Sequence, residues 1–133
     1  MKTVYTALLA TLIALTLACG YSAKSAPPPV AGTVPAISQL SPNAMTAGGA
    51  AFTLTVDGAN FGANAVVNWN GTAQATTTFV SGGQLTVAVP ASAIAMAGTV
   101  QITVTNPGTS GTGIYGTGGT LPETSAAMSF TIN

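Results

Sequence analysis

The chain has 133 residues, of which 47% are hydrophobic and only 3% are charged, with 2 basic side chains, 2 acidic ones and no histidine. Two cations cannot neutralise a run of phosphates, so this composition excludes nucleic-acid binding. One cysteine and two carboxylates are too few ligands for a zinc or transition-metal site, and the usual general acids and bases are nearly absent. We therefore expect no metal, no cofactor and no enzymatic activity.

Residues 1–18 are typical of a signal peptide. Lys2 provides a positive start, and Val4 to Ala18 forms an apolar stretch of 15 residues. A membrane-spanning helix needs about 20 such residues, so this stretch is short for a span and suits the core of a signal peptide. The sequence therefore predicts an exported protein.

Cys19 is the only cysteine and directly follows the apolar stretch, in the sequence Leu-Thr-Leu-Ala-Cys-Gly. This segment resembles a bacterial lipobox, in which the cysteine is acylated and becomes the mature N-terminus. Ala18 fits the small residue that a lipobox requires, whereas Thr16 replaces the usual leucine. The alternative is an ordinary signal peptide cut after Gly20 or Ser25, which would give a secreted protein. We favour the lipid anchor, because an unpaired cysteine in an exported protein is otherwise a liability.

Residues 20–34 are expected to form a proline-rich linker. Small residues and the run Pro27-Pro28-Pro29 cannot build a hydrophobic core, and prolines favour an extended polyproline II conformation. Such a linker would hold a lipid-anchored domain away from its membrane. A plain N-terminal tail is the alternative.

From residue 35 onward the hydrophobic pattern has a period of two. Alternating apolar and polar residues predict strands with one buried face. Four clear strands cover residues 52–57, 85–89, 100–105 and 128–132, and three weaker ones cover 36–40, 65–70 and 76–80. Ala93 to Ala97 could add one helical turn at most. Seven short strands separated by Gly, Pro and Asn predict an all-β fold, an immunoglobulin-like antiparallel β-sandwich.

Turn residues and one large aromatic refine this prediction. Asn70-Gly71 is a preferred pair for a tight hairpin and is expected to join the third and fourth strands. Trp69 is expected to face inward, on the same side of its strand as Val67. Asp57-Gly58 is expected to form a turn rather than part of a calcium site, which would need several carboxylates. Glu123 is expected on a solvated loop.

Several segments carry a family resemblance. They are Pro35-Ala36-Ile37, Leu40-Ser41-Pro42, Ala47-Gly48-Gly49 and residues 52–61, with agreement in residues 67–71, 85–90, 100–107 and 130–132. The sequence from Pro35 to Asn133 resembles the IPT/TIG family, an immunoglobulin-like domain of plexins, some transcription factors and many bacterial surface proteins. The resemblance implies the sandwich fold and no catalytic residue. Members serve as spacers, protein-binding modules or accessory domains of carbohydrate-active enzymes.

Asn106 to Ser125 is the one segment that a seven-stranded sandwich does not require. It joins the last two strands through 20 residues with six glycines, and loops beyond about 12–15 residues are usually functional or disordered. Ile114, Tyr115 and Leu121 are its large side chains. Most other aromatic residues fall on inward positions, so Tyr115 is expected to be free to stack on a sugar or to anchor a protein contact. The alternative is a surface insertion whose tyrosine packs back onto the sheet edge.

The sequence thus favours a non-enzymatic exported module of the cell envelope or surface, acting in protein contact, adhesion or structural spacing. A stand-alone carbohydrate-binding module is the alternative, so the partner is either a protein or a glycan. The expected location is lipid-anchored at the outer surface or in the periplasm, or secreted if Cys19 is not acylated. The lipid anchor is the only membrane contact that we expect.

Overall fold

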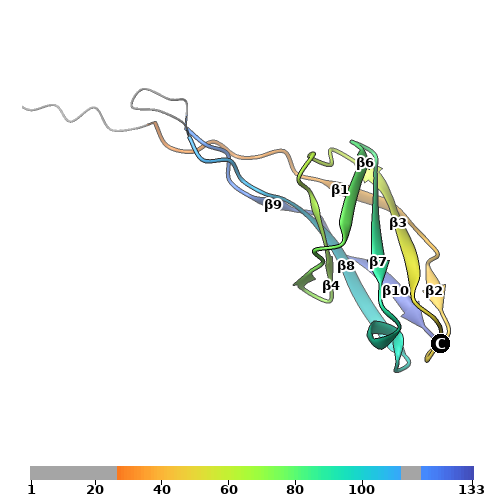
Figure 1. Ribbon diagram of the computed structural model, residues 1–133. Coiled ribbons are helices and arrows are strands. Elements are labelled where there is room, and N and C mark those ends of the chain that lie inside the picture. Colours follow the sequence, from red (N-terminus) through yellow and green to blue (C-terminus); the bar gives the residue numbers. More distant parts are fainter. Residues whose placement is uncertain (1–26, 112–117) are drawn as a thin grey trace, which may run out of the picture.

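Two sheets pack face to face in the computed structural model, which describes residues 27–111 and 118–133 (Figure 1). The first sheet has the order β1-β3-β7-β6, and its strands are β1 (Ala36–Ser41), β3 (Phe52–Ala59), β7 (Gln84–Val89) and β6 (Thr77–Ser81). The second has the order β2-β10-β8-β4-β5, with strands β2 (Ala44–Met45), β10 (Met128–Ile132), β8 (Gly98–Asn106), β4 (Val66–Trp69) and β5 (Thr72–Ala73). A further strand, β9 (Glu123–Thr124), pairs with β8. The only parallel strand pair among the described residues is β2 with β10.

All seven strands expected from the alternating pattern are present, as β1, β3, β4, β6, β7, β8 and β10. The described residues contain three more strands of two residues each, β2, β5 and β9. One turn of 3-10 helix, η1 (Ala91–Ile94), lies close to the helical turn expected at Ala93 to Ala97. The predicted all-β immunoglobulin-like sandwich is confirmed.

The core consists of the inward faces of these strands. On β3, Leu54 and Val56 are fully buried, whereas Thr53 between β3's apolar residues is exposed. The same alternation holds on β7, β8 and β10, because successive side chains of a strand point to opposite faces of a sheet. The buried set is Leu40, Leu54, Val56, Phe61, Ala65, Val67, Leu85, Val87, Val89, Ile94, Val100, Ile102, Val104, Phe130 and Ile132.

A row of three aromatic side chains crosses one end of this core. The fully buried ring of Phe130 stacks on Phe52, with ring centroids 5.7 Å apart and an interplanar angle of 12°. On its other side, Phe130 meets Trp69 at 5.2 Å and 53°. Trp69 therefore packs against the core beside Val67, as expected, but it is only partly buried.

The Asn70-Gly71 hairpin is present but joins different strands from those expected. Both residues have positive φ, 50° and 84°, and Trp69 pairs with Thr72 across the two-residue loop. The hairpin leads into β5, whereas the next predicted strand, β6, belongs to the other sheet. The prediction was wrong on this point, because after two residues of β5 the chain crosses between the sheets.

Asp57 and Gly58 lie inside β3 and do not form the expected turn. Gly58 pairs with Ile37 of β1, and a Cβ at this position would collide with the carbonyl oxygen of Ala36. It would also lie 2.6 Å from Cζ of Phe61. The close approach of β1 therefore requires glycine here, and this tertiary contact overrides the local turn preference of Asp-Gly.

In its described parts, residues 107–111 and 118–127, the segment between β8 and β10 is more regular than its glycines suggested. Glu123 lies in β9 and pairs with Asn106, so its expected place on a solvated loop is wrong. Farther out, Thr109 and Thr120 form a bridge, with an N–H···O bond of 3.0 Å and hydroxyls 3.1 Å apart. Backbone hydrogen bonds thus order this segment without any apolar alternation.

Part of the expected linker runs beside the Thr109–Thr120 bridge as a third strand-like segment. The N–H of Val30 donates to Gly119 O at 2.9 Å, and the N–H of Leu121 donates to Val30 O at 2.9 Å. We call residues 27–34, 107–111 and 118–122 together the stalk. It extends away from the sandwich, and the C-terminus lies at the opposite end of the molecule (Figure 1). No helix in the part of the chain that the structure describes is long and apolar enough to cross a membrane.

Candidate functional site

The sequence suggested Cys19 for lipidation and Ile114, Tyr115 and Leu121 for contact with a partner. Of these four residues, only Leu121 lies in the part of the chain that the structure describes. It lies on the stalk beside Val30, and 48% of its side chain is exposed. Cys19, Ile114 and Tyr115 lie outside the described residues. The structure therefore neither brings the expected contact residues together nor separates them.

The free edge of the four-stranded sheet is the first candidate contact surface. Its edge strand, β6, has the sequence Thr-Thr-Phe-Val-Ser without any charge. Phe79 and Val80 are 40% and 52% exposed, although both are large and apolar. The pairing of β6 with β7 shifts between Phe79 and Ser81, so Val80 is the extra residue of a bulge. Sheet edges are usually protected by charge or proline as well as by bulges, and β6 has only the bulge.

The other sheet edges of the described structure offer less apolar surface. On β1, Leu40 faces the core and Ile37 is partly buried. The Ser38 hydroxyl donates to Asp57 O at 3.1 Å, and a cis peptide bond precedes Pro42, where the chain passes from β1 to β2. β2 and β5 are only two residues long. The exposed large side chains of an edge strand therefore gather on β6.

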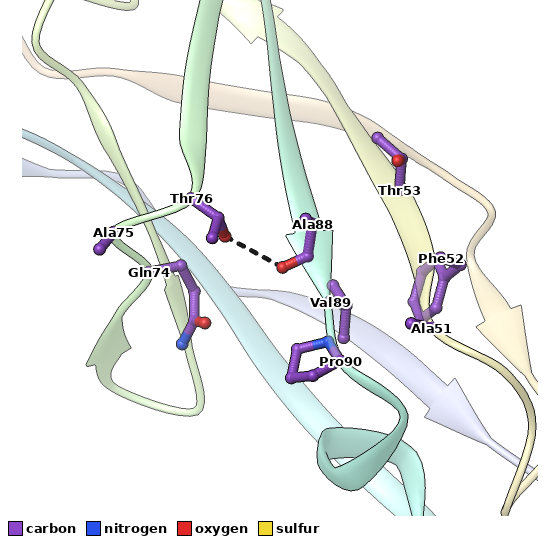
Figure 2. Close-up of a pocket in the computed structure, with 9 residues that line it drawn as sticks. All are labelled: Ala51, Phe52, Thr53, Gln74, Ala75, Thr76, Ala88, Val89 and Pro90. Carbon is purple, nitrogen blue, oxygen red and sulfur yellow. Dashed lines mark hydrogen bonds between the residues drawn. The ribbon is translucent and has the colours of Figure 1, made fainter.

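A hollow of about 560 Å³ lies where β6 begins (Figure 2). Gln74, Ala75 and Thr76, in the crossover from β5 to β6, line one side of it, and Ala51, Phe52, Thr53, Ala88, Val89 and Pro90 line the rest. The Thr76 hydroxyl donates to Ala88 O at 3.0 Å and attaches the crossover to β7. A mainly apolar hollow thus lies next to the start of β6, at the end of the sheet.

A second hollow, of about 610 Å³, lies on the other side of the same crossover. Its lining comes from the β4–β5 hairpin, from η1 and the turn after it, and from the ends of β8 and β10. Trp69 and Gln74 are part of it, and Gln74 also lines the first hollow. The aromatic row Phe52–Phe130–Trp69 therefore runs through the core from one hollow to the other.

A third hollow, of about 400 Å³, lies between the sandwich and the stalk, and Asn106 is its central residue. The Asn106 amide nitrogen donates to Thr33 O and Asn60 O, both at 2.8 Å, and its oxygen accepts from the Gly62 N–H at 2.8 Å. Both functional atoms of this side chain are thus used in attaching the stalk to the sandwich. Asn106 is a structural residue that the sequence did not indicate, because nothing local marks its three partners.

The two acidic side chains of the described residues lie on strands of different sheets. Asp57 lies on β3 in one sheet, where its Oδ1 accepts from Gln84 Nε2 at 2.8 Å. Glu123 lies on β9, which belongs to the other sheet. Within residues 27–111 and 118–133 there is also no group of three His, Cys, Asp or Glu side chains that could hold a metal ion.

The comparison with protein families agrees with this fold. The IPT/TIG domain model matches residues 35–121, and the chain belongs to the IPT/TIG family. Domains of this family are immunoglobulin-like modules that often act in protein–protein contact and are generally not catalytic. No curated protein and no solved structure shows significant similarity to the chain.

Sequence reasoning missed the surface around the β5–β6 crossover. Tyr115 was expected to be the one free aromatic, but Phe79 is exposed on β6 and Trp69 lines a hollow. A sequence signal did exist for β6: the strand expected at residues 76–80 has three threonines followed by Phe79 and Val80, without alternation of polar and apolar residues. That irregularity indicated a strand on which large apolar side chains need not face the core. Nothing local could have indicated Gln74.

Proposed function

We propose that this protein is a non-enzymatic, exported module of the cell envelope that binds another protein through the free edge of β6. The observation that carries the proposal is the exposed, uncharged apolar surface of β6, formed by Phe79 and Val80. An extended segment of a partner could add to this edge, because an edge strand has one row of backbone groups without a neighbouring strand.

The charge distribution supports a neutral partner segment. Asp57 and Glu123 are the only charged side chains between residues 27 and 133 apart from the chain terminus, and neither lies on β6. A partner with charged residues at the contact would lose hydration without gaining an ion pair. We therefore expect a partner segment rich in uncharged β-branched residues such as threonine and valine.

The stalk supports a role at a membrane surface. If Cys19 carries a lipid, the chain from the membrane reaches the sandwich through residues 27–34, which are hydrogen-bonded along the stalk. The end of the sandwich that carries η1 and the C-terminus then points away from the membrane (Figure 1). Secretion without an anchor is the alternative location.

Membrane fractionation tests the anchor. The wild-type chain is expected in the membrane fraction, and Cys19→Ser is expected to be misprocessed or released, because acyl chains contribute about 0.8 kcal/mol per buried CH₂. A mature N-terminus found unmodified at Tyr21 or Ala26 would contradict the anchor and leave the secreted form.

Partner capture from envelope extract tests the contact surface. Val80→Lys places a charge on the edge and is expected to abolish capture, whereas Gln39→Lys, on the edge strand β1, is expected to leave it unchanged. Equal capture by both variants would exclude β6 as the contact. Recovery of a second copy of this chain alone would replace the partner with self-association.

Carbohydrate binding is the second candidate function. The expected Tyr115 platform lies outside the described residues. The observation that favours this candidate is the uncharged hollow beside Trp69.

A further inference from the structure

The hollow beside Trp69 combines an aromatic ring with polar side chains and lacks charge. Its lining residues include Trp69, Thr72, Gln74, Ser92, Met96 and Thr99, and the others come from the β4–β5 hairpin, from η1 and the turn after it, and from strand ends. None of them is acidic or basic. A phosphate, an acidic sugar or a charged peptide side chain would find no counter-charge there. The hollow therefore suits an uncharged ligand.

The indole of Trp69 is held in place and still reaches the hollow. Phe130 fixes the ring from the core side, at 5.2 Å between centroids and an angle of 53°. The indole N–H has no hydrogen-bond partner among the described residues, and no side-chain nitrogen or oxygen there is both buried and unpartnered. Within the described residues the N–H is therefore an unused donor attached to a rigid apolar ring.

Gln74 supplies an oriented amide on the same wall. Its Nε2 donates to Thr72 O at 2.9 Å, which fixes the amide plane, and its Oε1 has no partner within the described part of the chain. The hydroxyls of Thr72, Ser92 and Thr99 are on exposed residues around the rim. The residues that line the hollow thus include, within the described part of the chain, an unused donor, an unused acceptor and several hydroxyls beside an aromatic ring.

Sugars have the chemistry that matches this arrangement. Each ring of a neutral sugar has an apolar C–H face for an indole and hydroxyls that both donate and accept hydrogen bonds. An extended peptide fits less well, since the adjacent edge strand β5 is only two residues long and could form few ladder hydrogen bonds. Met96, which is 81% exposed, extends the apolar side of the hollow.

We infer that this hollow binds a neutral glycan, with Trp69 as the stacking surface and Gln74 as the orienting amide. The inference rests on the second candidate function and gives it a site. No residue of β6 lines this hollow, and the β4–β5 hairpin and η1, which do line it, lie at the end of the sandwich opposite the stalk (Figure 1).

The fluorescence of Trp69 tests the inference directly, because it is the only tryptophan in the chain. The full chain is titrated with cellohexaose, xylohexaose, maltohexaose and chitohexaose, with hexagalacturonic acid as the acidic probe. At least one neutral hexaose is expected to change the emission saturably. Gln74→Ala should weaken that binding at least tenfold, whereas Gln39→Ala, an exposed glutamine on β1, should leave it unchanged.

The outcomes separate the site from the function. Gel retardation by a neutral polysaccharide without any Trp69 response would preserve carbohydrate binding and overturn this site. No retardation and no emission change with any neutral probe would overturn both. Binding of hexagalacturonic acid alone, or equal losses in Gln74→Ala and Gln39→Ala, would also overturn the inference. Circular dichroism of each variant confirms that a loss of binding is not a loss of fold.

Discussion

Gly58→Ala is expected to destabilise the domain through a collision between two paired strands. The added Cβ would overlap the carbonyl oxygen of Ala36, lie 3.0 Å from the carbonyl carbon of that residue and lie 2.6 Å from Cζ of Phe61. Ordinary carbon–carbon contacts are about 3.5–4.0 Å. Two of these three atoms are backbone, and the Phe61 ring is buried, so the clash can be relieved only by moving β1 away from β3. We expect a loss of about 1–3 kcal/mol in the free energy of unfolding.

Gly98→Ala is the matched control, because it adds the same methyl group to another strand. A Cβ at Gly98 meets no atom within 4 Å, and Gly98 does not have the positive φ that disfavours alanine. Restricting the unfolded chain should stabilise this variant by about 0.4–1 kcal/mol. The two variants should thus differ by about 1.5–4 kcal/mol.

Urea unfolding followed by the fluorescence of the single tryptophan measures this difference. With a typical slope of about 1–3 kcal/mol per molar urea, the midpoints should be separated by on the order of 1 M. Equal midpoints, or a Gly58→Ala variant as stable as the wild type, would refute the β1–β3 register and the role assigned to this glycine.

Three further predictions test the core, the stalk attachment and the stalk. Phe130→Ala should lose about 3–5 kcal/mol in urea unfolding, as for other fully buried aromatics, whereas Thr78→Ala on the exposed edge should stay within about 0.5 kcal/mol; similar losses would contradict the assigned faces. Asn106→Ala removes three hydrogen bonds and should cost about 1–3 kcal/mol, with faster exchange of the Gly62 amide; an unchanged rate would exclude that contact. The amide of Val30 should exchange slowly in the full chain, and exchange at the rate of an unfolded peptide would show a free linker.

The seven longer strands could be predicted because the period-two pattern is local. Apolar residues such as Leu85 and Val87 alternate with polar ones most clearly on β3, β7, β8 and β10, and the core needs only that alternation. Asn70-Gly71 was also sufficient to predict a tight hairpin, since few residues adopt positive φ readily. Where the second strand of that hairpin goes depends on the other sheet, so the partner of β4 was assigned wrongly.

The stalk and the two-residue strands could not be predicted from pattern. Thr109, Thr120 and Val30 are joined by backbone and hydroxyl hydrogen bonds, which any sequence of small polar residues can form. Glycine and proline in these segments favoured irregular structure, and only contacts distant in the chain order them. The candidate surfaces have the same origin: the hollow beside Trp69 exists because η1 and the β4–β5 hairpin meet at one end of the sandwich.

Site-specific photo-crosslinking in the producing cells tests whether the free edge of β6 binds a partner protein. A photoreactive amino acid at Val80 lies on the exposed bulge of that edge, and the same amino acid at Gln39 lies on β1 at the opposite edge of the sheet. If β6 binds a partner, position 80 is expected to give a covalent adduct with another protein and position 39 is expected to give none. Adducts of equal yield from both positions, or no adduct from position 80, would contradict binding through β6.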